Sequence, residues 1–172
     1  MFLFALTTQL ALATETPAPQ PASTAAPVPE VYRFVAAQRR LDLKLKTGAL
    51  TVRTSTSVDA IEVQIAAPTT CVVDWDTGGI IAISSCAADV TVVAPFGTAY
   101  QLTVGTGDVV LDTSGKVRLS VGTGDVSGTA RGGAVRVAVG TGNVQLTGLT
   151  EAPTIAVASG KTELSYAPGS GS

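Results

Sequence analysis

The 172-residue sequence contains no histidine, few charged residues and few aromatic side chains. Histidine is the usual general acid or base of enzymes and a frequent metal ligand, so its absence excludes the common histidine-based catalytic and metal sites. Charged residues make up 14% of the chain and the formal net charge is −2, which gives the chain no overall attraction for nucleic acid or an anionic membrane. We therefore expect no nucleic-acid partner and no cofactor.

Aromatic residues make up only 5% of the chain, and there are only two cysteines. Sugar-binding surfaces usually need exposed aromatic rings, so Trp75 is the single candidate anchor for a ligand, and covering a flank of the core is its simpler role. Cys71 and Cys86 are 86 − 71 = 15 residues apart, unlike the C-x-x-C pair of redox enzymes. We expect them to form a structural disulfide, worth about 3 kcal/mol for a loop of this length.

No apolar stretch reaches the roughly 20 residues that a membrane-spanning helix requires. Phe2 to Leu12 is apolar and leads into Ala11-Leu12-Ala13, a pattern that suits signal peptidase, although no lysine or arginine precedes it. We predict a signal peptide at residues 1–13 with cleavage after Ala13, an extended Pro/Ala-rich linker at 14–30, a β-repeat domain at 31–168 and a flexible tail at 169–172. The protein is expected to be exported to the periplasm or the cell surface.

One hexapeptide occurs three times, as VGTGDV at 104–109 and 121–126 and as VGTGNV at 139–144. The copies start 121 − 104 = 17 and 139 − 121 = 18 residues apart, a period that indicates stacked structural repeats. The same apolar frame can be followed through units that start at 45, 85, 104, 121, 139 and 157. Each unit contains two short alternating stretches that are typical of strands.

These patterns predict an all-β, single-domain fold in which about six two-strand coils, with a period of 17–19 residues, stack as a β-solenoid. Ile61, Val63 and Ile65 are expected to form the second strand of the first unit. An antiparallel meander is the alternative. A flat meander leaves its apolar face open to water, whereas a coil covers both inner faces, so we favour the solenoid.

The glycines of the repeats are expected to form the corners of the coils. Glycine can adopt the positive φ that a residue with a Cβ resists, and the polar residues beside it can accept backbone hydrogen bonds. No helix with the lysine and hydroxyl residue of a phosphate-binding loop follows these turns, so we do not expect them to bind nucleotides. The predicted repeat turns contain Gly48, Gly105, Gly107, Gly122, Gly124, Gly140 and Gly142.

Stacking would align the polar residues of successive turns in rows. Asp89, Asp108 and Asp125, followed by Asn143, would form one row, and these aspartates are the only candidates for a cation site. Hard cations need several oxygen ligands, whereas each coil offers one carboxylate, so we expect no metal.

A second row would hold the threonines of the turns, Thr47, Thr106, Thr123 and Thr141. Such a hydroxyl ladder stabilises a sheet, and the alternative is a surface that faces ice or a glycan. Arg118 and Arg136 occupy matching outward positions, where we expect them to be solvated surface residues.

The run DVTVVAPFGTAYQLTVGTGDV, from Asp89 to Val109, resembles the central signature of the bacterial putative-adhesin domain of unknown function. That family has a v-x-v-x-v-P segment that leads into l-x-l-x-x-G-x-G-d-v, and residues 48–52 resemble its early G-x-l-x-V stretch. The resemblance covers about residues 31–166, and the two cysteines lie outside the family pattern. It implies a β-solenoid-like fold at the bacterial cell surface or in the periplasm, and no established activity.

Three functions remain open for such a chain. The first is a non-enzymatic adhesin whose partner is a surface protein or a glycan. The second is a self-assembling component of the cell envelope, in which end coils pair with copies of the same chain. The third is a polysaccharide-acting enzyme, which would need clustered carboxylates, whereas the acidic residues here are spread one per coil. We favour the adhesin and expect no enzymatic activity.

Overall fold

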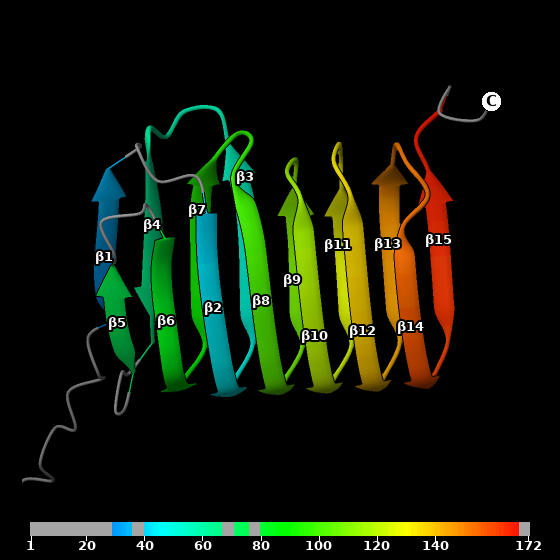
Figure 1. Ribbon diagram of the computed structural model, residues 1–172, viewed down its shortest axis with the longest axis horizontal. Coiled ribbons are helices and arrows are strands. Elements are labelled where there is room, and N and C mark those ends of the chain that lie inside the picture. The colour runs from blue at the N-terminus through cyan, green and yellow to red at the C-terminus, as the bar shows by residue number, and fades with distance from the viewer. Residues whose placement is uncertain (1–28, 36–39, 67–70, 76–79, 169–172) are drawn as a thin grey trace, which may run out of the picture.

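The computed structural model describes residues 29–35, 40–66, 71–75 and 80–168, without the side chains of Val35 and Trp75. Within these ranges the chain is all-β and contains no helix, as predicted (Figure 1). The described residues therefore include no helix that could cross a membrane. The predicted signal peptide at 1–13 with its cleavage after Ala13, all but the last two residues of the linker at 14–30, and the tail at 169–172 lie outside these ranges.

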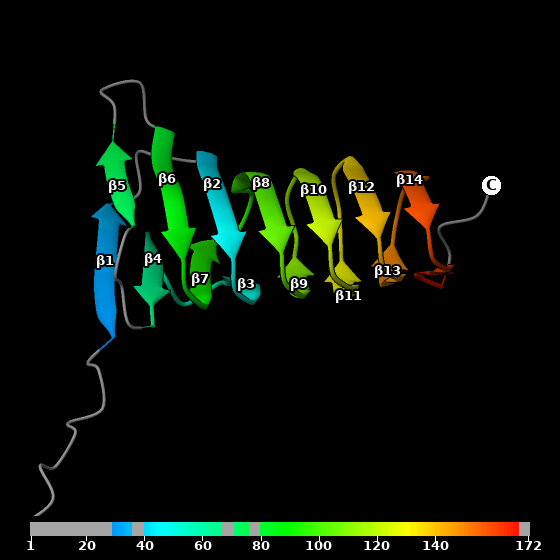
Figure 2. The ribbon, with the colours of Figure 1, turned by 90° about the horizontal axis from the view of Figure 1, so that it is seen from below.

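The strands form two open sheets that lie face to face (Figure 2). The eight-stranded sheet has the order β1 (Glu30–Val35), β4 (Ala60–Ile65), β7 (Val90–Pro95), β3 (Leu50–Ser55), β9 (Val109–Thr113), β11 (Val126–Ala130), β13 (Val144–Leu149) and β15 (Thr162–Tyr166). The seven-stranded sheet has the order β14 (Thr154–Ser159), β12 (Val135–Thr141), β10 (Val117–Thr123), β8 (Ala99–Thr106), β2 (Arg40–Thr47), β6 (Ile80–Ala87) and β5 (Val72–Trp75).

The chain crosses repeatedly from one sheet to the other. The chain passes from the seven-stranded to the eight-stranded sheet in the strand pairs β2/β3, β6/β7, β8/β9, β10/β11, β12/β13 and β14/β15. Successive repeats from β8 onward are hydrogen-bonded in parallel, and equivalent residues lie opposite one another, as Val121 does to Val104 and Val139. A strict repeat therefore produces rows of equivalent side chains along each sheet.

The strand pairs are not stacked in chain order. Strand β2 lies between β6 and β8, and β3 lies between β7 and β9, so the first pair is inserted between the second and the third. The sequence frame implied consecutive stacking, and the structure corrects it. The segment between β3 and β6 is long enough to carry the chain away and back, so matching apolar patterns rather than chain order decide which strands meet.

The first half of the chain also contains antiparallel strands, so both sheets are mixed. Ile61, Val63 and Ile65 lie in β4, which pairs antiparallel with β1 and β7 in the eight-stranded sheet. They do not form the second strand of a coil, as the alternation had suggested. Strand β5 pairs antiparallel with β6 at the edge of the other sheet. Period-two alternation identifies a strand and its buried face but carries no information about its direction.

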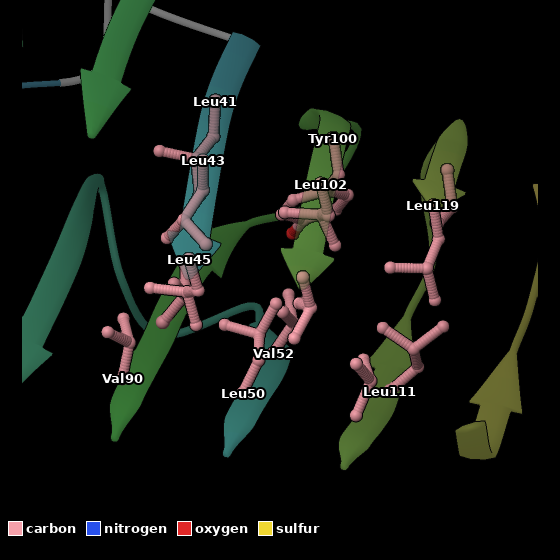
Figure 3. Close-up of a cluster of buried hydrophobic side chains, with 14 of the residues drawn as sticks. Leu41, Leu43, Leu45, Leu50, Val52, Val90, Tyr100, Leu102, Leu111 and Leu119 are labelled. Atoms are coloured by element: carbon pink, nitrogen blue, oxygen red, sulfur yellow. The ribbon is translucent and has the colours of Figure 1, made fainter. Parts of the chain in front are cut away.

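The core lies between the two sheets. Leu41, Leu43 and Leu45 of β2 point toward Leu50 and Val52 of β3, and all five are buried (Figure 3). The same alternation continues through β10, where buried valine and leucine residues alternate with exposed polar ones. Because the inner faces are almost entirely aliphatic, the polar side chains of both sheets are displayed on the two outer faces and on the turns.

Candidate binding surface

The repeat glycines satisfy two different geometric requirements. Gly48, Gly107, Gly124 and Gly142 have φ values of +124°, +146°, +143° and +144°, the backbone region that favours glycine. Gly105, Gly122 and Gly140 have no positive φ, which corrects the expectation for these three. A Cβ at Gly140 would lie 2.6 Å from the carbonyl oxygen of Gly122 in the next strand, and the other two face the same obstacle. Close approach of neighbouring backbones explains them.

The aspartates of the turns form a hydrogen-bonded ladder along the stack. The Asp125 amide donates to Asp108 Oδ1 at 2.9 Å, the Asn143 amide to Asp125 Oδ1 at 2.7 Å and the Lys161 amide to Asn143 Oδ1 at 3.1 Å. Asp89 is not the neighbour of Asp108, because the inserted pair β2/β3 separates them, and its Oδ1 accepts from the Ala49 amide at 2.8 Å. The row of turn aspartates predicted from the sequence therefore does not run directly from Asp89 to Asp108.

These contacts give the aspartates a structural role. Each carboxylate satisfies a backbone N–H that would otherwise be left free at a tight turn, and Asp125 Oδ1 also accepts from Asn143 Nδ2 at 3.1 Å. Among the residues that the structure describes, no three His, Cys, Asp or Glu side chains are grouped as a metal site would require. The ladder engages one oxygen, Oδ1, of each of Asp89, Asp108 and Asp125.

The turn threonines lie in register where the strands β2, β8, β10 and β12 of the seven-stranded sheet end. Thr47 lies opposite Thr106, Thr106 opposite Thr123, and Thr123 opposite Thr141, and all four are exposed. They form a single row of one hydroxyl per strand, which is narrow for a recognition surface.

A disulfide joins Cys71, just before β5, to Cys86 in β6, with a Cα–Cα distance of 4.2 Å. Cys86 is completely buried in the core cluster, and Cys71 packs against that cluster. Because β5 is a four-residue edge strand that pairs with β6, the bridge fastens the end of the seven-stranded sheet.

The outer face of the seven-stranded sheet is hollowed along its length. A groove of about 420 Å³ crosses β8, β10, β12 and β14, and its polar lining consists of Gln101, Thr103, Arg118, Ser120, Arg136 and Thr154. A hollow of about 230 Å³ adjoins it and shares Gln101 and Arg118. Another, of about 670 Å³, shares Ser120, Ala138 and Ala156. Together they form a continuous open trough with a mixed polar and apolar lining, which we call the sheet groove.

Gln101 is held in place at one side of the sheet groove. Its Oε1 accepts a hydrogen bond from Arg40 Nη2 at 3.0 Å, and its Nε2 donates to Asp42 Oδ2 at 3.2 Å. It lies opposite Asp42 on one neighbouring strand and opposite Arg118 on the other. Gln101 therefore separates the one acidic side chain on this part of the face from the arginine.

A smaller pocket, of about 330 Å³, lies among the turns beside Phe96, a residue that composition alone did not single out. Phe96 is 66% exposed, in a Pro-Phe-Gly turn where its side chain has no sheet face to pack against. Nearby, the Tyr100 hydroxyl lies 3.3 Å from Thr54 Oγ1, and burial raises the pKa of Tyr100, which keeps this hydroxyl neutral. The Trp75 side chain, the anchor considered from the sequence, lies outside the described side chains.

Comparison with known proteins identifies relatives of the fold only. Neither family models nor the sequences of curated proteins match this chain. The crystal structure of a "putative cell adhesion protein" from Clostridium sporogenes is similar over 81% of this chain and 97% of its own, with a TM-score of 0.52 and 12% identity. The crystal structure of a "putative adhesin" from Bacteroides fragilis is aligned over 80% of this chain and 97% of its own, but its TM-score of 0.31 is too low to establish a shared fold. A protein named for cell adhesion thus has a similar fold.

Proposed function

We propose that this protein is a non-enzymatic, exported adhesin that binds a surface partner through the sheet groove. In this proposal the six strand pairs act as a β-solenoid-like stack, a rigid scaffold that displays one long outer face. The observation that carries the proposal is the continuous trough on that face, lined by outward polar and small apolar side chains of regular strands. Sites on strands are held more rigidly than sites on loops, which suits repeated engagement of a partner.

Three further observations support the proposal. The similar fold of a protein named for cell adhesion agrees with a surface role. The disulfide is typical of an oxidising compartment, which agrees with export to the periplasm or the cell surface. The neighbouring carboxylates Asp108 and Asp125 both accept hydrogen bonds from backbone amides, which favours a structural use over glycoside hydrolysis.

Blocking the sheet groove is expected to abolish adhesion. Beads coated with the full-length protein should be retained on at least one surface of a panel of immobilised envelope polysaccharides and matrix proteins. The described part contains no free cysteine, so an Ala138→Cys variant can be coupled to polyethylene glycol inside the groove. Retention of these beads should fall to the level of uncoated beads, because the polymer occupies the face.

The matched control is Gln145→Cys, an exposed outward position of β13 on the opposite sheet, coupled to the same polymer. Its beads should be retained like the uncoupled protein. Equal loss from both couplings would contradict a role for the sheet groove, and no retention on any surface would contradict adhesion.

Self-assembly in the envelope is the second candidate, favoured by the open edge formed by β14 and β15. The amides of Gly142 and Val144 donate to Ser159 and Lys161, but the equivalent amides of Gly160 and Thr162 reach no acceptor within the described ranges. Leu164 and Tyr166 are 38% and 48% exposed beside them. Unpaired strand edges are templates for pairing with another chain.

If the chain assembles through this edge, light scattering should show growth with concentration that the variant Leu164→Lys/Tyr166→Lys lacks. A Gln145→Lys variant, charged on the outer face instead, should grow like the unmodified protein. A monomer at every concentration would reject assembly through β14 and β15.

A further inference from the structure

The charges of this nearly neutral chain are unevenly distributed over its surface. The outer face of the seven-stranded sheet and its edge carry the basic residues Arg40, Lys44, Lys46, Lys116, Arg118 and Arg136. On the same face, the described acidic side chains are Asp42 and Asp74, on β2 and β5. None of the described residues that line the sheet groove is acidic. The groove is thus a basic surface on a chain whose formal net charge is −2.

Two arginines stand side by side over the floor of the groove. Arg118 and Arg136 lie directly opposite one another on adjacent parallel strands, which are about 4.8 Å apart. Both are exposed, and neither takes part in an ion pair within the described part of the chain, where the salt bridges are those of Arg33 with Asp59 and Glu62. Like charges directly opposite one another in a sheet are destabilising, so this arrangement favours an anion between them.

The surroundings of the arginine pair suit a sugar. The row beside them consists of Thr103, Ser120, Ala138 and Ala156, so the floor is low and partly lined with hydroxyls. Gln101 and Thr154 extend the arginine row on either side. Guanidinium groups bind carboxylates through paired hydrogen bonds, and hydroxyl and amide side chains can bind sugar hydroxyls.

We propose that the sheet groove binds an acidic polysaccharide, with Arg118 and Arg136 each binding a carboxylate of a uronic-acid chain. This inference rests on the proposed adhesin function and assigns the chemistry of its partner. Thr103, Ser120, Gln101 and Thr154 bind the sugar hydroxyls around the two carboxylates. The open trough, which continues past the pair in both directions, accommodates a polymer rather than a single small molecule.

The lining of the groove distinguishes this ligand from other polyanions. Tyr100, the aromatic residue among the described residues that line the groove, is buried in the core, so its ring is not available for a nucleic-acid base to stack on. The lining also contains no large outward apolar side chain to insert into a lipid surface, since Leu102, Leu119 and Val137 are buried in the core. Hydroxyl groups beside paired guanidinium groups are the combination that recognises an acidic sugar.

The experiment is a calorimetric titration of the full-length protein with oligogalacturonate, and with the same oligomer after methyl esterification, which removes the charge but keeps the sugar chain. The acidic oligomer should bind, more weakly as salt rises, and the esterified one should bind at least about tenfold more weakly. Arg118→Gln/Arg136→Gln should lose at least about tenfold in affinity for the acidic oligomer. Ser120→Asp, which adds a carboxylate beside Arg118, should lose affinity similarly.

The control is Arg53→Gln/Arg131→Gln, which removes the same charge from positions outside the groove. It should bind like the unmodified protein. The melting temperature of the unliganded Arg118→Gln/Arg136→Gln variant should equal or exceed that of the unmodified protein. The two substitutions remove the repulsion between the neighbouring arginines.

Equal losses in the groove and control pairs would overturn the proposal, as would equal binding of both oligomers. Tighter binding of duplex DNA or of anionic vesicles than of oligogalacturonate would also overturn it. If oligogalacturonate does not bind but the coupled Ala138→Cys beads still lose retention, the adhesin function stands and its ligand is not a polyuronate.

Discussion

Replacing Cys71 and Cys86 together by alanine is expected to lower the free energy of unfolding by about 3 kcal/mol. The bridge closes a loop of 15 residues, and removing it returns that conformational freedom to the unfolded chain. The loss is expected to be concentrated at one end of the fold, because β5 is a short edge strand held by β6 and by this disulfide. Urea denaturation followed by far-UV circular dichroism measures the change.

Alanine is the appropriate replacement because Cys86 is completely buried, and a serine there would add the separate cost of an unsatisfied hydroxyl. The unmodified protein in reductant is the control and should show nearly the same loss. Unchanged stability after both treatments would show that the bridge contributes nothing to the folded state. Stability lost in reductant but not in the double variant would point to an effect of the free thiols.

The second large effect is expected from Gly107→Ala, which should lower the free energy of unfolding by about 3 kcal/mol. Gly107 has a φ of +146°, a sparsely populated conformation that costs residues other than glycine about 1–3 kcal/mol. The added Cβ would also collide with the carbonyl group of Gly48 in the adjacent turn, and such overpacking costs about 1–3 kcal/mol. Thermal and urea unfolding measure the total.

Two other glycines separate these contributions. Gly97 has a φ of +82° with nothing within 4 Å of the added Cβ, so Gly97→Ala should cost only about 1 kcal/mol. Gly105 has no positive φ, but its Cβ would collide with the carbonyl of Lys46, so Gly105→Ala should show the collision alone, about 1–3 kcal/mol. If all three variants lower the free energy of unfolding by the same amount, close stacking of the turns does not explain the glycine at position 107.

The sequence predicted most of the local structure correctly because its repeat is strict. The apolar positions of each hexapeptide, such as Val109 and Val126, lie in register on the inner face of the eight-stranded sheet. Prediction failed where the repeat is degenerate. Strand β2 has the same alternation of apolar and polar residues as β6 and β8, so its leucines can pack between those strands or beside either one. No local feature of the sequence shows that β2 lies between them.

The sheet groove was largely invisible in the sequence for a related reason. Arg118 and Arg136 were recognised as equivalent outward positions, but solvation was the simpler interpretation in a chain with a net charge of −2. Their lack of acidic neighbours depends on which strands flank β10 and β12, and on Gln101 lying between Arg118 and Asp42. Net charge sums over both outer faces and therefore conceals a difference between them.

By itself, the sequence determined the all-β class and the short strands of the strict repeats with their buried positions, because alternation and a strict repeat are local properties of the chain. Only the tertiary structure decided the order of the strand pairs, the antiparallel strands at one end and the collection of basic side chains on one face. These depend on pairing between segments far apart in the chain, where several neighbours satisfy the same apolar pattern and the complete packing selects among them.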